Sequence, residues 1–168
     1  AIADIINLKR GESSVVIGHD CRNNSRELSL EVANIFSANN IKVFIFDSLK
    51  PTPLISYAVR QLDCICGIVL TASHNPPEYN GYKVYWKDGG QIVPPMDKEI
   101  IEKINKTDYS NIKFSPKNDL IKILDENTEE EFKKLESYID HDRDYLFTYA
   151  GLRQVVDKYL VQDRSSNQ

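Results

Sequence analysis

The chain has 168 residues, of which 41% are hydrophobic and 27% are charged, and its formal net charge is −4. This balance is typical of a globular protein with one domain, or one domain and an appendage. The acidic charge and the lack of a basic stripe argue against a general nucleic-acid-binding protein. No apolar run is long enough to cross a bilayer, and no basic segment followed by an apolar one opens the sequence. We therefore expect no membrane partner and a cytoplasmic location.

The first part of the chain alternates between strand-like and helix-like segments. Residues 15–18 are a short apolar run that ends at Gly18, which predicts a strand. Apolar residues then recur at helical spacing through residues 26–39, with Ser25 at the position of an N-cap. Residues 41–46 predict a second strand because they are rich in β-forming residues.

The same alternation continues further along the chain. A rigid, proline-containing connector at residues 51–53 leads to a short helix at residues 54–62, with Thr52 as its expected cap. Residues 65–70 are an apolar run, which predicts a buried third strand. Residues 82–86 alternate between polar and apolar side chains, which predicts a fourth strand.

The last predicted elements complete the fold class. Residues 88–90 mark a turn, and residues 95–104 predict a helix that begins at a proline. The acidic segment at residues 125–131 is expected to be a solvated helix start. Together these elements predict an α/β fold, in which a layered α/β/α domain surrounds a mixed, mostly parallel sheet with right-handed crossovers.

The three cysteines are Cys21, Cys64 and Cys66. Their odd number and the absence of a Cys-x-x-Cys spacing favour reduced thiols over disulfides or a zinc site. Cys64 and Cys66 are two residues apart in a strand-like segment, so we expect them to share a face as small core residues.

The hexapeptide Thr-Ala-Ser-His-Asn-Pro at residues 71–76 directly follows the third predicted strand. In an open α/β sheet, the loop beyond such a strand faces the crevice where ligands bind. A serine hydroxyl in this loop is a poor nucleophile until a base or a metal activates it. The neighbouring Ser73 and His74 leave open the alternative of a small serine hydrolase. However, adjacent residues rarely align as part of a catalytic triad, and no Gly-x-Ser-x-Gly motif is present. An ordinary loop, with Ser73 or Asn75 as a helix cap, is the simpler alternative.

Four blocks of sequence together resemble domain I of the α-D-phosphohexomutases, the phosphoglucomutase and phosphomannomutase superfamily. The blocks are Gly-His-Asp-Cys-Arg-Asn-Asn-Ser at residues 18–25, Pro-Thr-Pro at 51–53, the hexapeptide at 71–76, and Glu-Tyr-Asn-Gly-Tyr-Lys-Val-Tyr-Trp at 78–86. They stand in the order and at the spacing of that family, over about residues 14–104. The last block resembles the branch of phosphoglucomutases and phosphopentomutases.

The resemblance implies a phosphoryl carrier at Ser73. In the family this serine is phosphorylated in the resting enzyme and donates its phosphoryl group to a sugar monophosphate, which gives a bisphosphate. The serine then recovers the other phosphoryl group, so that sugar 1-phosphate and 6-phosphate (or 5-phosphate) interconvert. Lys83 matches the lysine that is proposed to handle the proton of the sugar hydroxyl, and His74 is a further candidate catalytic residue. Surface and purely structural roles for Lys83 and His74 remain open.

The resemblance also implies residues that bind substrate or phosphate. Arg22 matches the arginine of an Asp-x-Arg motif that lines the cleft, although an ion pair with Asp20 is the structural alternative. Asn75 is expected to shape the loop and to make polar contacts in the site. A relative that keeps the fold as a non-catalytic binding module is the alternative function, and the intact Ser73, Lys83 and Arg22 argue against it.

The resemblance implies Mg²⁺ and glucose 1,6-bisphosphate as cofactors. A phosphoserine carries about −1.5 to −2 charges, which a metal and cationic side chains must offset. In the family the ligating aspartates lie in domain II, and this chain has no Asp-x-Asp-x-Asp-Arg run. Ser73 is therefore expected to contact the metal through its phosphate alone. Because the loops that select the sugar and bind its phosphate lie in further domains, we expect those domains as partners and the isolated chain to be inactive.

The C-terminal segment resembles the family in an unexpected order. Residues 147–153 resemble the strand that opens domain I, yet here they follow the rest of the domain. We interpret residues 1–125 as the core of domain I and residues 126–168 as its N-terminal segment, placed out of native order. Arg153 in that segment matches a phosphate-binding position, although Gln154 stands where the family has a glycine.

Overall fold

The fold is described here from a computed structural model of the chain, for residues 1–8 and 13–124. All of these residues belong to one compact unit, residues 1–128. The expectations for the acidic segment at 125–131, for the order of residues 126–168 and for Arg153 lie outside the described residues.

The described strands form one sheet in the order β4-β3-β1-β2-β5. They are β1 (Ser14–His19), β2 (Lys42–Phe46), β3 (Cys66–Leu70), β4 (Tyr82–Trp86) and β5 (Ile121–Leu124). β1 is parallel to both β2 and β3, and β2 is parallel to β5, whereas β4 is antiparallel to β3. The prediction of a mixed, mostly parallel sheet is therefore confirmed.

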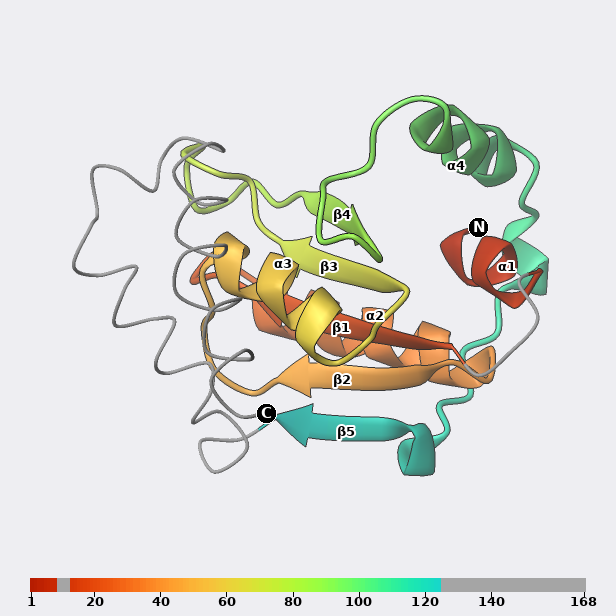
Figure 1. Cartoon of the computed structure of the whole chain (residues 1–168), viewed down its shortest axis with the longest axis horizontal. Coiled ribbons are helices and arrows are strands. Elements are labelled where there is room, and N and C mark those ends of the chain that lie inside the picture. Colours follow the sequence, from red (N-terminus) through yellow and green to blue (C-terminus); the bar gives the residue numbers. More distant parts are fainter. Residues whose placement is uncertain (9–12, 125–168) are drawn as a thin grey trace, which may run out of the picture. The chain divides into compact units, whose positions relative to one another are not determined.

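Helices lie on both faces of this sheet (Figure 1). The helices are α1 (Ile2–Asn7), α2 (Ser25–Ala38), α3 (Thr52–Gln61) and α4 (Met96–Asn105), with short 3-10 helices η1 (Tyr109–Asn111) and η2 (Asn118–Leu120) before β5. α2 covers one face and α3 the other, and α1 packs against the α2 side of the core. None of the helices in the described ranges combines the length and the apolar character needed to span a membrane.

The core is built in two halves because alternate strand residues point to opposite faces. On the α2 side, Val15 and Ile17 of β1 pack into a cluster with Phe36 of α2. On the α3 side, β1 carries Gly18, where a Cβ would lie 2.3 Å from Cδ1 of Ile55. The missing side chain therefore lets α3 pack closely on the strand that leads to the site.

The bounds of three helices differ from the predictions. Ser25 is the first residue of α2, and the N-cap is Asn24, with φ +61°. Thr52 is the first residue of α3, with Pro51 as the N-cap, and Pro95 precedes α4 as its N-cap. Ser25 and Thr52 make no capping hydrogen bond, and the hydroxyl of Ser25 has partners elsewhere in the fold, which are described below.

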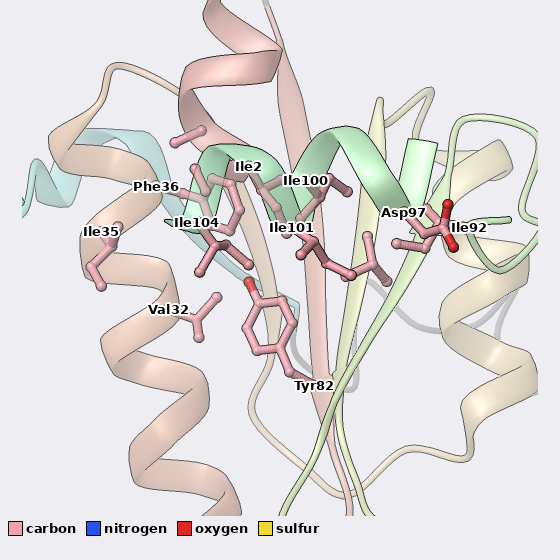
Figure 2. A pocket seen from close by; sticks show the side chains of 13 residues that line it. Ile2, Val32, Ile35, Phe36, Tyr82, Ile92, Asp97, Ile100, Ile101 and Ile104 are labelled. Carbon is pink, nitrogen blue, oxygen red and sulfur yellow. The ribbon is translucent and has the colours of Figure 1, made fainter. Parts of the chain in front are cut away.

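An apolar cavity of about 510 Å³ lies between α1, α2, α4 and β4 (Figure 2). Its wall includes Val32, Phe36 and Ile100, and Asp97 is the one carboxylate in its lining. Residues 71–81 do not contribute to this lining. The cavity is therefore separate from the loop that carries the candidate nucleophile.

Candidate functional site

The carboxyl ends of β1 and β3 bring two of the four sequence blocks to one edge of the sheet. His19 and Leu70 are register partners at these ends. The backbone N–H of the next residue, Asp20, donates to the carbonyl oxygen of Leu70 at 3.2 Å. Because the two strands are parallel and adjacent, the loops that follow them leave the sheet side by side. Residues 20–22 thereby meet the loop at 71–76.

Ser73 is exposed and has a backbone φ of +59°, in the left-handed region. Residues other than glycine adopt this region uncommonly, and such residues cluster at functional sites. The backbone N–H of Ser73 donates to Oγ1 of Thr71 at 3.1 Å. Its Oγ lies 3.4 Å from Nδ1 of His74, which is a long contact. The hydroxyl thus stands on a fixed backbone at the solvent-facing edge of the sheet.

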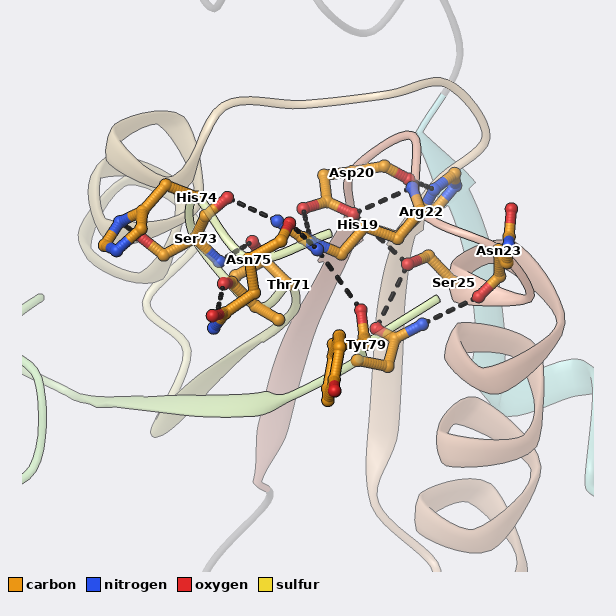
Figure 3. A network of polar contacts seen from close by, with 12 residues as sticks. His19, Asp20, Arg22, Asn23, Ser25, Thr71, Ser73, His74, Asn75 and Tyr79 are labelled. Carbon is orange, nitrogen blue, oxygen red and sulfur yellow. Dashed lines mark hydrogen bonds and ion pairs between the residues drawn. The ribbon is translucent and has the colours of Figure 1, made fainter. Parts of the chain in front are cut away.

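The guanidinium of Arg22 holds this loop by donating hydrogen bonds to the backbone carbonyl groups of the loop (Figure 3). One terminal nitrogen of the guanidinium donates to the carbonyl oxygens of Asn75 at 2.7 Å, Pro76 at 2.8 Å and Tyr79 at 3.2 Å. The other terminal nitrogen donates to the carbonyl oxygen of Ser73. The side chain is only 7% exposed. Arg22 therefore acts as a clamp on the loop, and its binding of a substrate phosphate stays a prediction.

Asp20 is the carboxylate that orients this clamp. Its Oδ1 accepts a hydrogen bond from the backbone N–H of Arg22 at 3.1 Å, and its Oδ2 accepts one from Nε of the same residue at 3.0 Å. The hydroxyls of Thr71 and Ser25 also donate to it. Partial burial raises the pKa of Asp20, but the hydrogen bonds from Thr71, Arg22 and Ser25 and the charge of Arg22 outweigh it and hold this pKa below its usual value.

A second set of contacts joins the far end of the loop to the start of α2. The backbone N–H of Asn23 donates to the carbonyl oxygen of Pro77 at 3.1 Å, and Nδ2 of Asn80 donates to the carbonyl oxygen of Asn23 at 2.8 Å. Oγ of Ser25 lies 3.1 Å from Oδ1 of Asn80. The hydroxyl of Ser25 thus contacts Asp20 and Asn80, which lie in two different loops, and this explains why it does not cap α2.

Lys83 lies on β4, where it is the register partner of Val69. Opposite residues in an antiparallel pair share a face, so its side chain leaves from the face of Val69. Lys83 is one residue from the strand end at which Tyr82 pairs with Leu70, the last residue before the loop. Its side chain makes no hydrogen bond or ion pair with residues 1–8 or 13–124. Its ammonium is therefore uncommitted in the described part, and its role toward a sugar hydroxyl stays a prediction.

His74 and Asn75 lie in the loop beside Ser73, and His74 does not form a catalytic triad with the described residues. Apart from its contact with Ser73, His74 has no polar partner among the described residues, and no carboxylate lies behind it there. Nδ2 of Asn75 donates to the carbonyl oxygen of Ala72 at 3.0 Å, and its backbone N–H donates to the same oxygen at 3.1 Å. Asn75 therefore shapes the turn, while roles of Asn75 and His74 toward substrate stay predictions.

The sequence reasoning missed Thr71, and it named Asp20 only as a possible ion-pair partner of Arg22, a pair that the structure contains at 3.0 Å. Thr71 stands two residues before Ser73 and Asp20 two residues before Arg22, which are the spacings of side chains that bond to the backbone in ST and Asx turns. These spacings could have identified both residues. Lys50 is also buried near the same edge, where its backbone N–H donates to the carbonyl oxygen of His19 at 3.1 Å, and no sequence pattern identified it.

The described residues do not form a metal site of their own. Within residues 1–8 and 13–124, no three His, Cys, Asp or Glu side chains lie close enough together to hold a metal ion. Asp20, the carboxylate that contacts the loop, already accepts hydrogen bonds from several donors. The residues present therefore do not fit Mg²⁺ by themselves, and the ligands expected for it are not in this part of the chain.

Comparison with known proteins identifies the family. Residues 1–111 match the family described as "Phosphoglucomutase/phosphomannomutase, alpha/beta/alpha domain I". The phosphoglucomutase of Staphylococcus saprophyticus is 42% identical over 104 residues, which cover 62% of this chain and 19% of that protein. The glucose 1,6-bisphosphate synthase of Homo sapiens is 41% identical over 97 residues, which cover 54% of this chain and 16% of that protein.

Solved structures agree with this assignment. A Thermus thermophilus protein assigned as a phosphomannomutase superposes with a TM-score of 0.68 and 31% identity, over 82% of this chain and 30% of that chain. The chain spans less than a third of the length of the relatives compared here. Since the family match covers more than half of the chain, the protein belongs to the phosphoglucomutase/phosphomannomutase family and carries its α/β/α domain I.

Proposed function

We propose that the chain is the phosphoserine-bearing domain of a phosphoglucomutase-like enzyme. The enzyme would interconvert sugar 1-phosphate and 6-phosphate, or 5-phosphate, through a bisphosphate intermediate. The observation that supports this most strongly is the geometry of Ser73, an exposed serine at φ +59° whose loop is bound by a largely buried arginine. Its relatives include a phosphoglucomutase and a glucose 1,6-bisphosphate synthase, whose names both describe phosphorylated glucose.

Phosphoryl transfer from Ser73 requires mainly that the reacting groups are aligned and that negative charge is neutralised. In the forward half-reaction, a sugar hydroxyl oxygen forms a bond to the phosphorus on Ser73 while the bond from phosphorus to Oγ breaks. The sugar hydroxyl loses its proton, and Oγ of Ser73 takes up a proton as its bond to phosphorus breaks. Lys83, whose neutral amine can accept a proton, is the proposed carrier for the sugar proton. Because phosphoryl transfer passes through a loose transition state, in-line alignment and charge neutralisation supply most of the catalysis. A serine on a fixed backbone suits this requirement.

The proposal includes parts that this chain does not supply. Mg²⁺ would neutralise charge on the phosphate when bound, and the described residues do not ligate it. The loops expected to select the sugar and bind its phosphate also lie in other domains. We therefore infer that the isolated chain does not turn over, and that the activity requires the domains which its longer relatives carry.

The two rival functions have less support. A serine hydrolase needs a base that is oriented by a third group, and no described carboxylate contacts His74. A fluorophosphonate probe is expected to leave Ser73 unlabelled. A non-catalytic binding module would not require the hydrogen bonds that fix the loop around Ser73.

A domain replacement tests the proposal. Residues of this chain are placed where they align in the Staphylococcus saprophyticus phosphoglucomutase, which gives a chimera with all the missing domains. We expect the chimera to convert glucose 1-phosphate, the Ser73→Ala chimera to be inactive, and the control Ser110→Ala chimera to keep its activity. The isolated chain should show no steady turnover in the same assay with Mg²⁺ and glucose 1,6-bisphosphate. A Ser73→Ala chimera that works as well as its parent would contradict the proposal.

A further inference from the structure

Asp20 is linked to both sides of the Ser73 backbone, although it makes no hydrogen bond with Ser73 itself in the described part of the chain. One link runs through Thr71, whose hydroxyl donates to the Asp20 carboxylate. The other runs through Arg22, which donates to the carboxylate from both its backbone N–H and its Nε. The carboxylate of Asp20 thus contacts Thr71, two residues before Ser73, and Arg22, which binds the loop that carries Ser73.

The Thr71 link fixes the N–H side of Ser73. An ionised carboxylate only accepts hydrogen bonds, so the hydroxyl proton of Thr71 must point toward Asp20. The hydroxyl oxygen then presents its lone pairs to the backbone N–H of Ser73, which donates to it at 3.1 Å. Thr71 is 5% exposed, and its own N–H donates to the carbonyl oxygen of Gly81 at 3.1 Å. The acceptor for Ser73 is therefore held in place on a buried residue.

The Arg22 link fixes the carbonyl side of Ser73. The hydrogen bond from its Nε to Oδ2 of Asp20, at 3.0 Å, fixes the plane in which the guanidinium lies. In that plane one terminal nitrogen donates to the carbonyl oxygen of Ser73 and the other to the oxygens of the following loop. The orientation of the clamp therefore depends on the carboxylate.

We propose that Asp20 is a positioning residue for phosphoryl transfer, which fixes the backbone of Ser73 from both sides through Thr71 and Arg22. The inference rests on the proposed function of Ser73. A positive φ is costly for a residue with a side chain and persists only where its surroundings enforce it. The two links supply that enforcement. The Asp20→Asn side chain has the same shape as aspartate but only one acceptor oxygen. The donors of Thr71, Ser25 and Arg22 must then compete for this oxygen, so the two links cannot both be kept.

The backbone part of the proposal is tested on the full chain by amide hydrogen exchange. We expect the Ser73 amide to exchange about tenfold faster in Thr71→Val, which has the same shape without an acceptor, and in Asp20→Asn. Thr71→Ser keeps the hydroxyl and should restore the slow exchange. Asp88→Asn is the matched control, since Asp88 accepts from the N–H of Gly90 at 2.9 Å in a turn outside this network. An unchanged Ser73 amide in both Thr71→Val and Asp20→Asn overturns the proposal.

The catalytic part is tested in the chimera. A displacement of the nucleophile by about 1 Å costs on the order of 100-fold in rate, so Asp20→Asn and Thr71→Val should lower kcat by about 10- to 100-fold. The KM should change by less than about twofold, because these residues act on alignment. Thr71→Ser should restore kcat. Normal kcat in Asp20→Asn, beside an inactive Ser73→Ala chimera, overturns this inference alone. An active Ser73→Ala chimera overturns the proposed function instead.

Discussion

Gly81 and Thr71 are in direct backbone contact, so closely that a Cβ on Gly81 would lie 2.5 Å from the carbonyl oxygen of Thr71. The contact is a hydrogen-bonded one, since the N–H of Thr71 donates to the carbonyl oxygen of Gly81 at 3.1 Å. It joins the entry of β4 to the first residue of the Ser73 loop. Two of the sequence blocks are thereby held together at the level of the main chain, before any side chain contributes.

This contact predicts a cost for the smallest possible side chain. Gly81→Ala should lower the free energy of unfolding by about 1–3 kcal/mol, because the clash is with backbone that cannot move without shifting the loop. Urea unfolding of the full chain measures the change. The control is Gly90→Ala, whose Cβ would first meet the flexible Asp88 carboxylate at 3.3 Å. Equal stabilities of the two variants would show that the Gly81 contact is not tight.

The geometry of Arg22 predicts that lysine cannot replace it. A lysine ammonium lacks the fork that lets one side chain reach Asp20 and several carbonyl groups at once. Arg22→Lys should therefore speed deuterium uptake by residues 73–79 by about tenfold in exchange measured by mass spectrometry. Arg26→Lys, at an exposed position of α2, is the matched control. Uptake in Arg22→Lys that equals wild type would refute the clamp.

The sequence predicted most elements of the fold because their side chains carry a clear period. It missed β5, whose four residues, Ile121–Leu124, are too few to show one. What makes this segment a strand is its parallel pairing with β2, a contact far away in sequence. It also misplaced the cap of α2, because the hydroxyl of Ser25 donates to Asp20 and lies 3.1 Å from Oδ1 of Asn80, which is 55 residues away and which no local pattern reveals.

The candidate site divides in the same way. The meeting of Arg22 with the Ser73 loop was predictable from the family resemblance, which implies that Arg22 lines the cleft of Ser73. That Arg22 contacts the loop through backbone carbonyl groups was not, because main-chain acceptors have no sequence signature. The central place of Asp20 was missed for a related reason: its partner Thr71 lies on a different strand end. The proposed roles of Lys83 concern a substrate that the structure does not contain.

The three cysteines should differ sharply in reactivity. Cys21 is exposed, whereas Cys64 and Cys66 are buried. Burial raises the pKa of the Cys64 thiol to about 11 and raises the pKa of Cys66 as well. Because the thiolate is the reactive form, iodoacetamide at about pH 8 should modify Cys21 in the native chain.

The distribution of the adducts by peptide mass spectrometry checks this prediction. The native chain should carry the modification on Cys21, and addition of urea should expose Cys64 and Cys66 to it. Rapid modification of either buried thiol without denaturant would mean that the core near β3 opens readily.

The low pKa of Asp20 predicts an acid-dependent part of the stability. As pH falls, the unfolded chain takes up this proton before the folded one, so the stabilisation is complete above about pH 4 and is lost as pH falls through the folded pKa. Asp20→Asn should therefore have a lower stability at neutral pH but a shallower loss between about pH 4 and pH 2. Urea unfolding across this range measures both slopes, with exposed Asp119→Asn as the control. Parallel curves for wild type and Asp20→Asn would contradict the assignment.

The most direct measurement is phosphopeptide mapping of the chimera after incubation with radiolabelled glucose 1,6-bisphosphate. The proposed function predicts that label appears on the peptide that contains Ser73 and is chased from it by unlabelled glucose 1-phosphate. Label on any other residue, or label on Ser73 that the sugar phosphate does not remove, would contradict its role as the phosphoryl carrier.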